Sequence, residues 1–62
     1  MSFSEKRKSA NLTMAQAAEI LDVTPAAICQ WETGKTMPKA EKLPEIAKAY
    51  GCTIDDLMKE DT

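Results

Sequence analysis

The stretch TMAQAAEILDVTPAAICQWETG (residues 13–34) contains the signals that start and stop two consecutive helices. Thr13 and Gln16 have the spacing of a capping box, in which each side chain binds the other residue's backbone amide. A second cap follows at Thr24, with a proline at the first helical position, where its missing amide has no cost. Gly34 should end this second helix, because glycine adopts a left-handed backbone without steric strain. The stretch therefore predicts two short helices joined by a tight turn.

The turn between these two helices is expected at Asp22. The first helix should end near Leu21, and aspartate tolerates a left-handed backbone better than most residues do. We therefore expect a positive φ at Asp22.

The residues before this stretch predict one more helix. SFSE (residues 2–5) has the pattern of a capping box, with Ser2 as the cap and Glu5 reaching back. The helix should run from about residue 3 to residue 10. Asn11 can take the left-handed conformation that stops it.

The residues after this stretch predict two further helices. KTMPKAEK (residues 35–42) is expected to be a loop with one loose helical turn. LPEIAKAYG (residues 43–51) has proline in its first turn and glycine past its end, and TIDD (residues 53–56) opens a short last helix. The sequence shows no alternating strand pattern, so we expect an all-α, compact five-helix bundle that forms a single domain over residues 1–62.

Composition excludes several classes of protein. The chain has 62 residues and a net charge of −2, and no apolar run approaches the ~20 residues of a membrane span. No signal-peptide pattern precedes the first charged residues, so we expect a cytoplasmic protein. It has two cysteines and no histidine, whereas a zinc site takes about four ligands. We therefore expect no metal, no cofactor and, without a nucleophile–base pair, no enzyme.

The helix over residues 24–33 has two contrasting faces. Residues three and four apart share a face, which places Ala27, Ile28 and Trp31 together as a candidate core. The opposite face carries no charge, whereas most outward faces of helices are charged. It consists of Pro25, Ala26, Cys29, Gln30 and Thr33.

The stretch of residues 13–34 resembles the helix-turn-helix of phage-repressor or Xre/Cro-type regulators, whose DNA-binding domains are lambda-repressor-like five-helix bundles. The resemblance extends over nearly the whole chain, from Arg7 through WETGK (residues 31–35) to LPEIAKAYGCTIDDL (residues 43–57). The order and spacing of these fragments carry the signal. The resemblance implies a central helix-turn-helix and a sequence-specific transcriptional regulator that binds double-stranded DNA.

The resemblance also implies which residues contact bases. It makes residues 24–33 the recognition helix in the major groove. Gln30 can pair with adenine through two hydrogen bonds, and Ala26 can touch a thymine methyl group. We interpret Cys29 as a tolerated small residue rather than a redox sensor, because no basic cluster surrounds it in the sequence. The implied base contacts are Pro25, Ala26, Cys29 and Gln30.

Phosphate contacts are implied at the start of the first motif helix and after the recognition helix. Met14 departs from the family, which often has a phosphate-binding glutamine there, but Thr13 and Gln16 can supply polar contacts at the same helix N-terminus. The lysines that follow are either phosphate contacts or a solvated basic loop. So few basic residues predict weak, salt-sensitive non-specific binding. The implied phosphate contacts are Thr13, Gln16, Thr33, Lys35, Thr36, Lys39 and Lys42.

Two structural expectations complete the resemblance. It places Arg7 beside Glu32 and Trp31 as a partly buried ion pair. It also implies a homodimer on a near-palindromic operator. The expected dimer surface is Cys52, Ile54, Leu57 and Met58, with the alternative that Ile54 and Leu57 belong to the core.

A second interpretation stays open, in which the fold serves as a protein-interaction module or an antitoxin with weak or no DNA binding of its own. The sequence pI of 4.9 and Met14 favour it. Gln30, Lys35 and the uncharged helix face oppose it. Neither interpretation requires a membrane or a small-molecule ligand.

Overall fold

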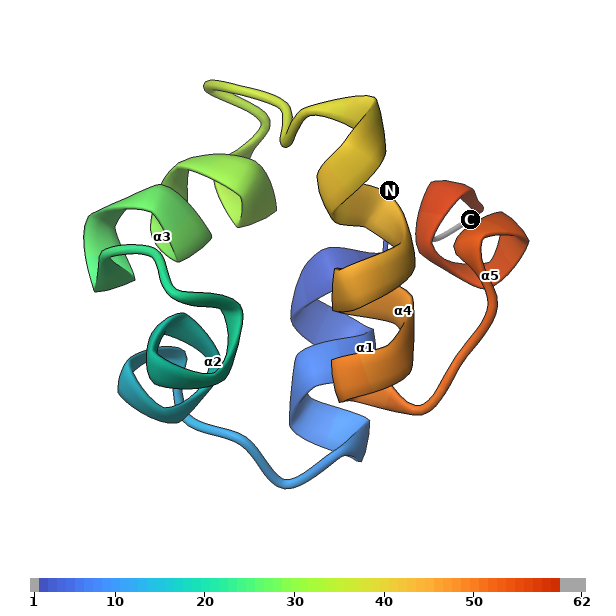
Figure 1. Ribbon diagram of the computed structural model, residues 1–62, viewed down its shortest axis with the longest axis horizontal. Coiled ribbons are helices and arrows are strands. Elements are labelled where there is room, and N and C mark those ends of the chain that lie inside the picture. Colours follow the sequence, from blue (N-terminus) through green and yellow to red (C-terminus); the bar gives the residue numbers. More distant parts are fainter. Residues whose placement is uncertain (1, 60–62) are drawn as a thin grey trace.

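The computed structural model describes residues 2–59, which form five α-helices and one short 3-10 helix, η1 (Figure 1). The described part of the chain contains no strand, so the all-α five-helix prediction is confirmed. The elements are α1 (Phe3–Ser9), α2 (Met14–Leu21), α3 (Pro25–Thr33), η1 (Ala40–Lys42), α4 (Leu43–Tyr50) and α5 (Ile54–Met58).

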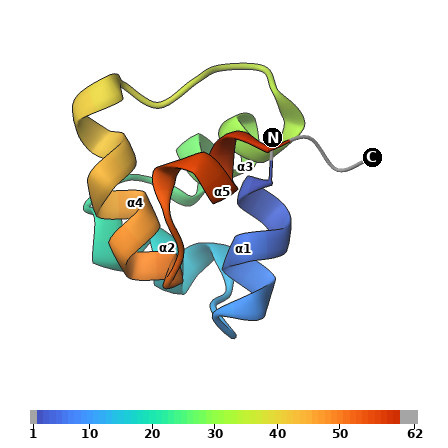
Figure 2. The same cartoon turned by 90° about the vertical axis from the view of Figure 1, so that its right-hand side faces the viewer.

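The five α-helices surround a shared core. Helices α2 and α3 lie against each other at one side of the molecule, α1 and α4 occupy the middle, and α5 covers α4 on the far side (Figure 1). Figure 2 shows the connection from α3 to η1 running along the top edge of the bundle. Helix α3 lies at the periphery of the bundle, with α2 and α1 as its main packing partners (Figure 1).

Local capping fixes the bounds of most helices as the sequence predicts. The Thr13 hydroxyl accepts from the Gln16 amide at 3.1 Å, and the Thr13 amide donates to Gln16 Oε1 at 2.9 Å. The Thr24 hydroxyl caps α3 by accepting from the Ala27 amide at 3.2 Å. A second capping box, between Thr53 and Asp56, opens α5. These three predicted caps are confirmed.

The predicted cap of α1 is wrong. The Ser2 side chain makes no capping bond to α1; its hydroxyl donates to the Lys59 carbonyl oxygen at 2.7 Å. The Ser2 amide donates to the Leu57 carbonyl oxygen at 2.9 Å. Ser2 is therefore buried against the end of α5, and this long-range pairing replaces the local cap.

The core is assembled from all five α-helices. Ala17 and Ala18 have exposed fractions of 0% and 3%, which lets α2 approach α3 closely. Phe3, Ile28, Ile46 and Leu57 are the largest fully buried side chains. The assignment of Leu57 to a dimer surface is therefore wrong, because this side chain points inward from α5.

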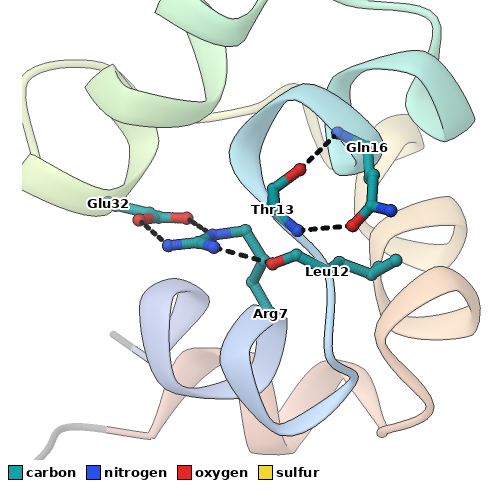
Figure 3. A network of polar contacts seen from close by, with 5 residues as sticks. All are labelled: Arg7, Leu12, Thr13, Gln16 and Glu32. Atoms are coloured by element: carbon teal, nitrogen blue, oxygen red, sulfur yellow. Dashed lines mark hydrogen bonds and ion pairs between the residues drawn. The ribbon is translucent and has the colours of Figure 1, made fainter.

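A buried ion pair connects α1 to the end of α3 (Figure 3). Arg7 Nε donates to Glu32 Oε2 at 2.6 Å, and a second guanidinium nitrogen donates to Glu32 Oε1 at 3.3 Å. The third nitrogen donates to the Leu12 carbonyl oxygen at 2.8 Å. The two side chains are 9% and 6% exposed. The hydrogen bond to Glu32 raises the pKa of Arg7 above its usual value, so the guanidinium stays charged.

Tyr50 lies close enough to this pair to respond to its charges. Burial, and after it the Glu32 carboxylate, raises the pKa of Tyr50 to about 12. The phenol therefore stays neutral at pH 7.

None of the helices in the part of the chain described here has the length and apolar character needed to cross a membrane.

Replacing Arg7 by alanine should destabilise the domain strongly. The change leaves Glu32 as an uncompensated buried charge, and breaking a buried pair in this way costs ~3–5 kcal/mol. Thermal and urea unfolding measure the effect. Glu32→Gln should cost less, since the neutral amide can still accept from Arg7. Glu45→Gln is the control, because it breaks the exposed Lys42–Glu45 pair and should change stability by less than ~1 kcal/mol. An Arg7→Ala variant as stable as Glu45→Gln would contradict the structural role of the pair.

Asp22 should accept glycine and reject a β-branched residue. Its φ of 56° lies in the left-handed region, as predicted. Asp22→Gly should be neutral or stabilise slightly, whereas Asp22→Val should destabilise by about 1–2 kcal/mol. Urea unfolding of the two variants gives the comparison. The result would contradict the argument if valine and glycine were tolerated equally.

Candidate DNA-binding site

Helix α3 presents its small residues to solvent and its large ones to the core. Ile28 is fully buried and Trp31 is 8% exposed. Pro25, Ala26 and Cys29 are exposed, and Gln30 is half-buried on the same outer side. The structure therefore brings the four expected base-contacting residues together on one uncharged face.

The end of α3 anchors the loop that follows it. Gly34 has a φ of 79°, which turns the chain away from the helix axis. The Gln30 carbonyl oxygen then accepts from the amides of Lys35 at 2.9 Å and Thr36 at 3.3 Å. The hydroxyl of Thr33 also donates to this oxygen, at 3.3 Å. The outer face of α3 and the start of the basic loop are thus held in one fixed relation.

The lysines after α3 differ in solvent exposure and in whether they form an ion pair. Lys35 and Lys39 are exposed. Lys42, at the end of η1, is half-buried and pairs with Glu45 at 3.0 Å. Part of its charge is therefore compensated within the protein. Thr36 is exposed beside Lys35.

The N-terminus of α2 offers polar groups in a defined orientation. Thr13 and Gln16 are exposed. Because Gln16 Oε1 accepts the Thr13 amide, the NH₂ group of Gln16 points away from this bond, as Figure 3 shows. An NH₂ group held in this way can donate to an anionic oxygen. Met14, in contrast, packs partly buried against the core.

The expected dimer residues are divided by the structure. Ile54 is 38% exposed, and Cys52 and Met58 are half-buried against the core. With Leu57 buried, the expected dimer residues that still reach the surface are Ile54 and the outer parts of Cys52 and Met58.

Two large hydrophobic residues outside the predicted contact and dimer residues are exposed. Ile20 is 57% exposed and Met37 is 50% exposed. Met37 stands between Lys35 and Lys39 in a stretch without helical periodicity, so no pattern assigned it to the core. The sequence therefore contained no signal for the exposure of Met37.

The described residues contain no group of three or more histidine, cysteine, aspartate or glutamate side chains placed to hold a metal ion. The exposed small and polar side chains described above define the candidate site, which consists of the outer face of α3, the loop after it and the N-terminus of α2.

Comparisons with known proteins agree with this geometry. A family model described as helix-turn-helix matches residues 3–57. The HTH-type transcriptional activator BcrR of Enterococcus faecalis is 45% identical over 62 residues, which cover 94% of this chain and 30% of that protein. Repressor protein C2 of Salmonella phage P22 is 36% identical over 56 residues, which cover 90% of this chain and 26% of that protein. The comparison with solved structures found no match.

The chain thus spans less than a third of the length of either relative. The match nevertheless includes all five α-helices apart from the last residue of α5. Together with the two capped helices α2 and α3 and the left-handed turn at Asp22, this match shows that the chain belongs to the helix-turn-helix family of Xre and lambda-repressor-like proteins.

Proposed function

We propose that this chain is a sequence-specific regulator of transcription that binds double-stranded DNA with α3 in the major groove. The observation that carries the proposal is the outer face of α3, which is uncharged and made of small side chains and one amide. Such a face can approach base edges closely. The two relatives are named as an activator and a repressor, which supports transcriptional control and leaves its direction open.

Gln30 is the main candidate for direct recognition of a base. Its amide can donate to adenine N7 and accept from adenine N6 at the same time. Pro25, Ala26 and Cys29 have no long polar groups, so they contribute apolar contact and allow the helix to enter the groove. This division makes Gln30 the residue whose loss changes sequence preference.

The phosphate contacts follow from the position of the exposed polar groups around α3. Lys35, Thr36 and Lys39 lie in the loop anchored to Gln30, and Thr13 and Gln16 lie at the N-terminus of α2. Donors on both sides of a recognition helix fix its position on the duplex without reading sequence. Thr33 and Lys42 are the weaker candidates, since each already makes a bond within the protein.

The protein-interaction module or antitoxin remains the second candidate function. Its support is the pI of 4.9 and the partly buried Met14. The experiments below distinguish it, because a module without DNA binding would show no preference for any duplex.

We propose a homodimer on DNA that uses the exposed part of α5. Operators read by dimeric helix-turn-helix proteins contain two half-sites about one helical turn apart. Ile54 is the large apolar side chain that α5 leaves exposed, with Met58 and Cys52 beside it as partly buried neighbours.

Gln30→Ala and Lys35→Ala should weaken DNA binding in different ways. Gln30→Ala should lose roughly 1–3 kcal/mol against the preferred operator and relax the preference at one base pair, with little change in the salt slope. Lys35→Ala should weaken binding to all sequences alike and lower the salt slope by about one unit. Both side chains lie outside the core, so neither change should lower the melting temperature noticeably. Titrations on a selected operator and on scrambled DNA, at several salt concentrations, measure both effects.

The operator for these titrations can be selected from random duplexes. Lys8→Ala on the exposed surface of α1 is a matched control, because it removes one lysine charge without changing a proposed contact. If Gln30→Ala bound every sequence as wild type does, the proposed orientation of α3 would be wrong. If the wild-type chain bound no duplex at all, the interaction-module function would replace the present one.

Ile54→Asp should prevent dimer formation on operator DNA while leaving the fold intact. A charge at the centre of an apolar contact cannot be solvated in the dimer, whereas in the monomer it remains in water. Sedimentation with and without a palindromic duplex should show two chains per duplex for wild type and one for the variant. Ile20→Asp is the matched control, since Ile20 is exposed on α2. A wild-type complex of one chain per palindromic duplex would contradict the dimer.

A further inference from the structure

Met37 is held at the protein surface by a loop that is fixed at both ends. On one side, the Lys35 and Thr36 amides bind the Gln30 carbonyl oxygen at 2.9 and 3.3 Å. On the other side, Pro38 is buried and the Lys42 amide donates to the Lys39 carbonyl oxygen at 2.8 Å. The side chain between these anchors is 50% exposed. The exposure of Met37 therefore follows from the fixed conformation of the loop.

The surroundings of Met37 are apolar underneath and positive along the edge. Val23, Trp31 and Pro38 form the floor of a shallow hollow of about 240 Å³, with Met37 at its rim. Lys39 and Lys42 border the same hollow, and so does Glu41. The Glu41 carboxylate disfavours a phosphate inside the hollow. Along the chain, Met37 lies between Lys35 and Lys39, and both of these lysines are exposed.

Single exposed hydrophobic residues are common and need no explanation by themselves. Met37 differs because it lies in the loop that is bound to the Gln30 carbonyl oxygen and that carries the two lysines proposed to meet DNA. A duplex backbone presents phosphates and, between them, the apolar carbon–hydrogen edges of deoxyribose. Methionine is flexible and polarisable, which suits contact with such an irregular apolar surface.

We propose that Met37 is a DNA contact that packs against deoxyribose in the strand whose phosphates are bound by Lys35 and Lys39. The proposal rests on the proposed function and adds an apolar contact to its polar ones. Contacts to the backbone carry no sequence information, and an uncharged side chain releases no counterions. Met37 therefore contributes affinity that depends on neither the base sequence nor the salt concentration. Gln30 and Lys35 each lack one of these two properties.

The first test compares Met37→Ala with Met37→Lys in binding titrations on operator and scrambled duplexes over a range of salt. Met37→Ala should weaken binding to both duplexes by the same factor, about three- to tenfold, for the apolar area no longer buried. Its salt slope should equal that of wild type. Met37→Lys should recover affinity at low salt and raise the slope by about one unit, because a new cation then meets the backbone.

Ile20→Ala is the matched control, since Ile20 is a similarly exposed aliphatic residue outside the loop. This variant should bind DNA as wild type does. Melting temperatures of all variants show whether a loss of binding reflects a loss of folding, and the Met37→Lys slope gives the answer even if Met37→Ala is less stable.

The second test uses oxidation of methionine to its sulfoxide by hydrogen peroxide, followed by peptide mass analysis. Operator DNA should slow the oxidation of Met37 at least severalfold. The rate of Met37 oxidation in the protein without DNA is the reference.

The outcomes separate the two levels of the proposal. If Lys35→Ala weakens binding but Met37→Ala does not, and DNA leaves Met37 oxidation unchanged, the Met37 contact is wrong and the proposed function stands. If wild type binds neither duplex, the proposed function fails and the Met37 contact fails with it. A Met37→Ala loss confined to the operator would also overturn the backbone contact, since it would indicate reading of bases.

Discussion

The guanidinium of Arg7 connects three parts of the chain that the rest of the structure depends on. It donates hydrogen bonds to the Glu32 carboxylate at the end of α3 and to the Leu12 carbonyl oxygen just before α2. Arg7 itself is a buried residue of α1. The planar group donates to both targets in fixed directions, which a lysine or an apolar side chain at this position could not do. The pair therefore sets the orientation of α2 and α3 relative to the bundle as well as adding stability.

This arrangement separates folding from recognition within a single helix. The inner face of α3 is occupied by Ile28 and Trp31 and ends on Glu32, so it carries the stability of the helix. The outer face is left with small side chains and Gln30. The carbonyl oxygen of Gln30 holds the loop, and its side chain remains available on the outside. Substitutions on the outer face can therefore change binding without unfolding the domain.

The fold could be predicted from the sequence wherever the decisive interactions were local. The caps at Thr13, Thr24 and Thr53 and the turn at Asp22 depend on residues at most four positions apart. The cap at Ser2 was wrong because its hydroxyl binds Lys59, 57 positions away, and no local pattern contains that contact. The sequence left open whether Leu57 belonged to the dimer surface or to the core, because α5 is only 5 residues long, too short for periodicity to identify its inner face.

Different parts of the candidate site could be predicted from different kinds of information. The uncharged face of α3 could be derived from spacing alone, whereas the Arg7–Glu32 pair followed only from resemblance to a family. Met37 could not be identified from the sequence, because exposure in a loop has no periodic signature. It became visible once the anchors at Gln30 and Pro38 were known. Two of the acidic residues, Asp55 and Asp56, lie on α5, on the side away from α2 and α3 (Figure 1), so these two charges do not oppose DNA at α3.

One bidentate base contact discriminates by ~1–3 kcal/mol, and specific sites are typically bound ~4–10 kcal/mol more tightly than non-specific ones. A single Gln30 cannot supply that difference, and two copies related by a dimer reach only its lower half. On the proposed function, the remainder comes from the apolar contacts of Pro25 and Ala26 and from the shape of the DNA, and this is why we propose a dimer with close helix–groove contact for this weakly charged surface.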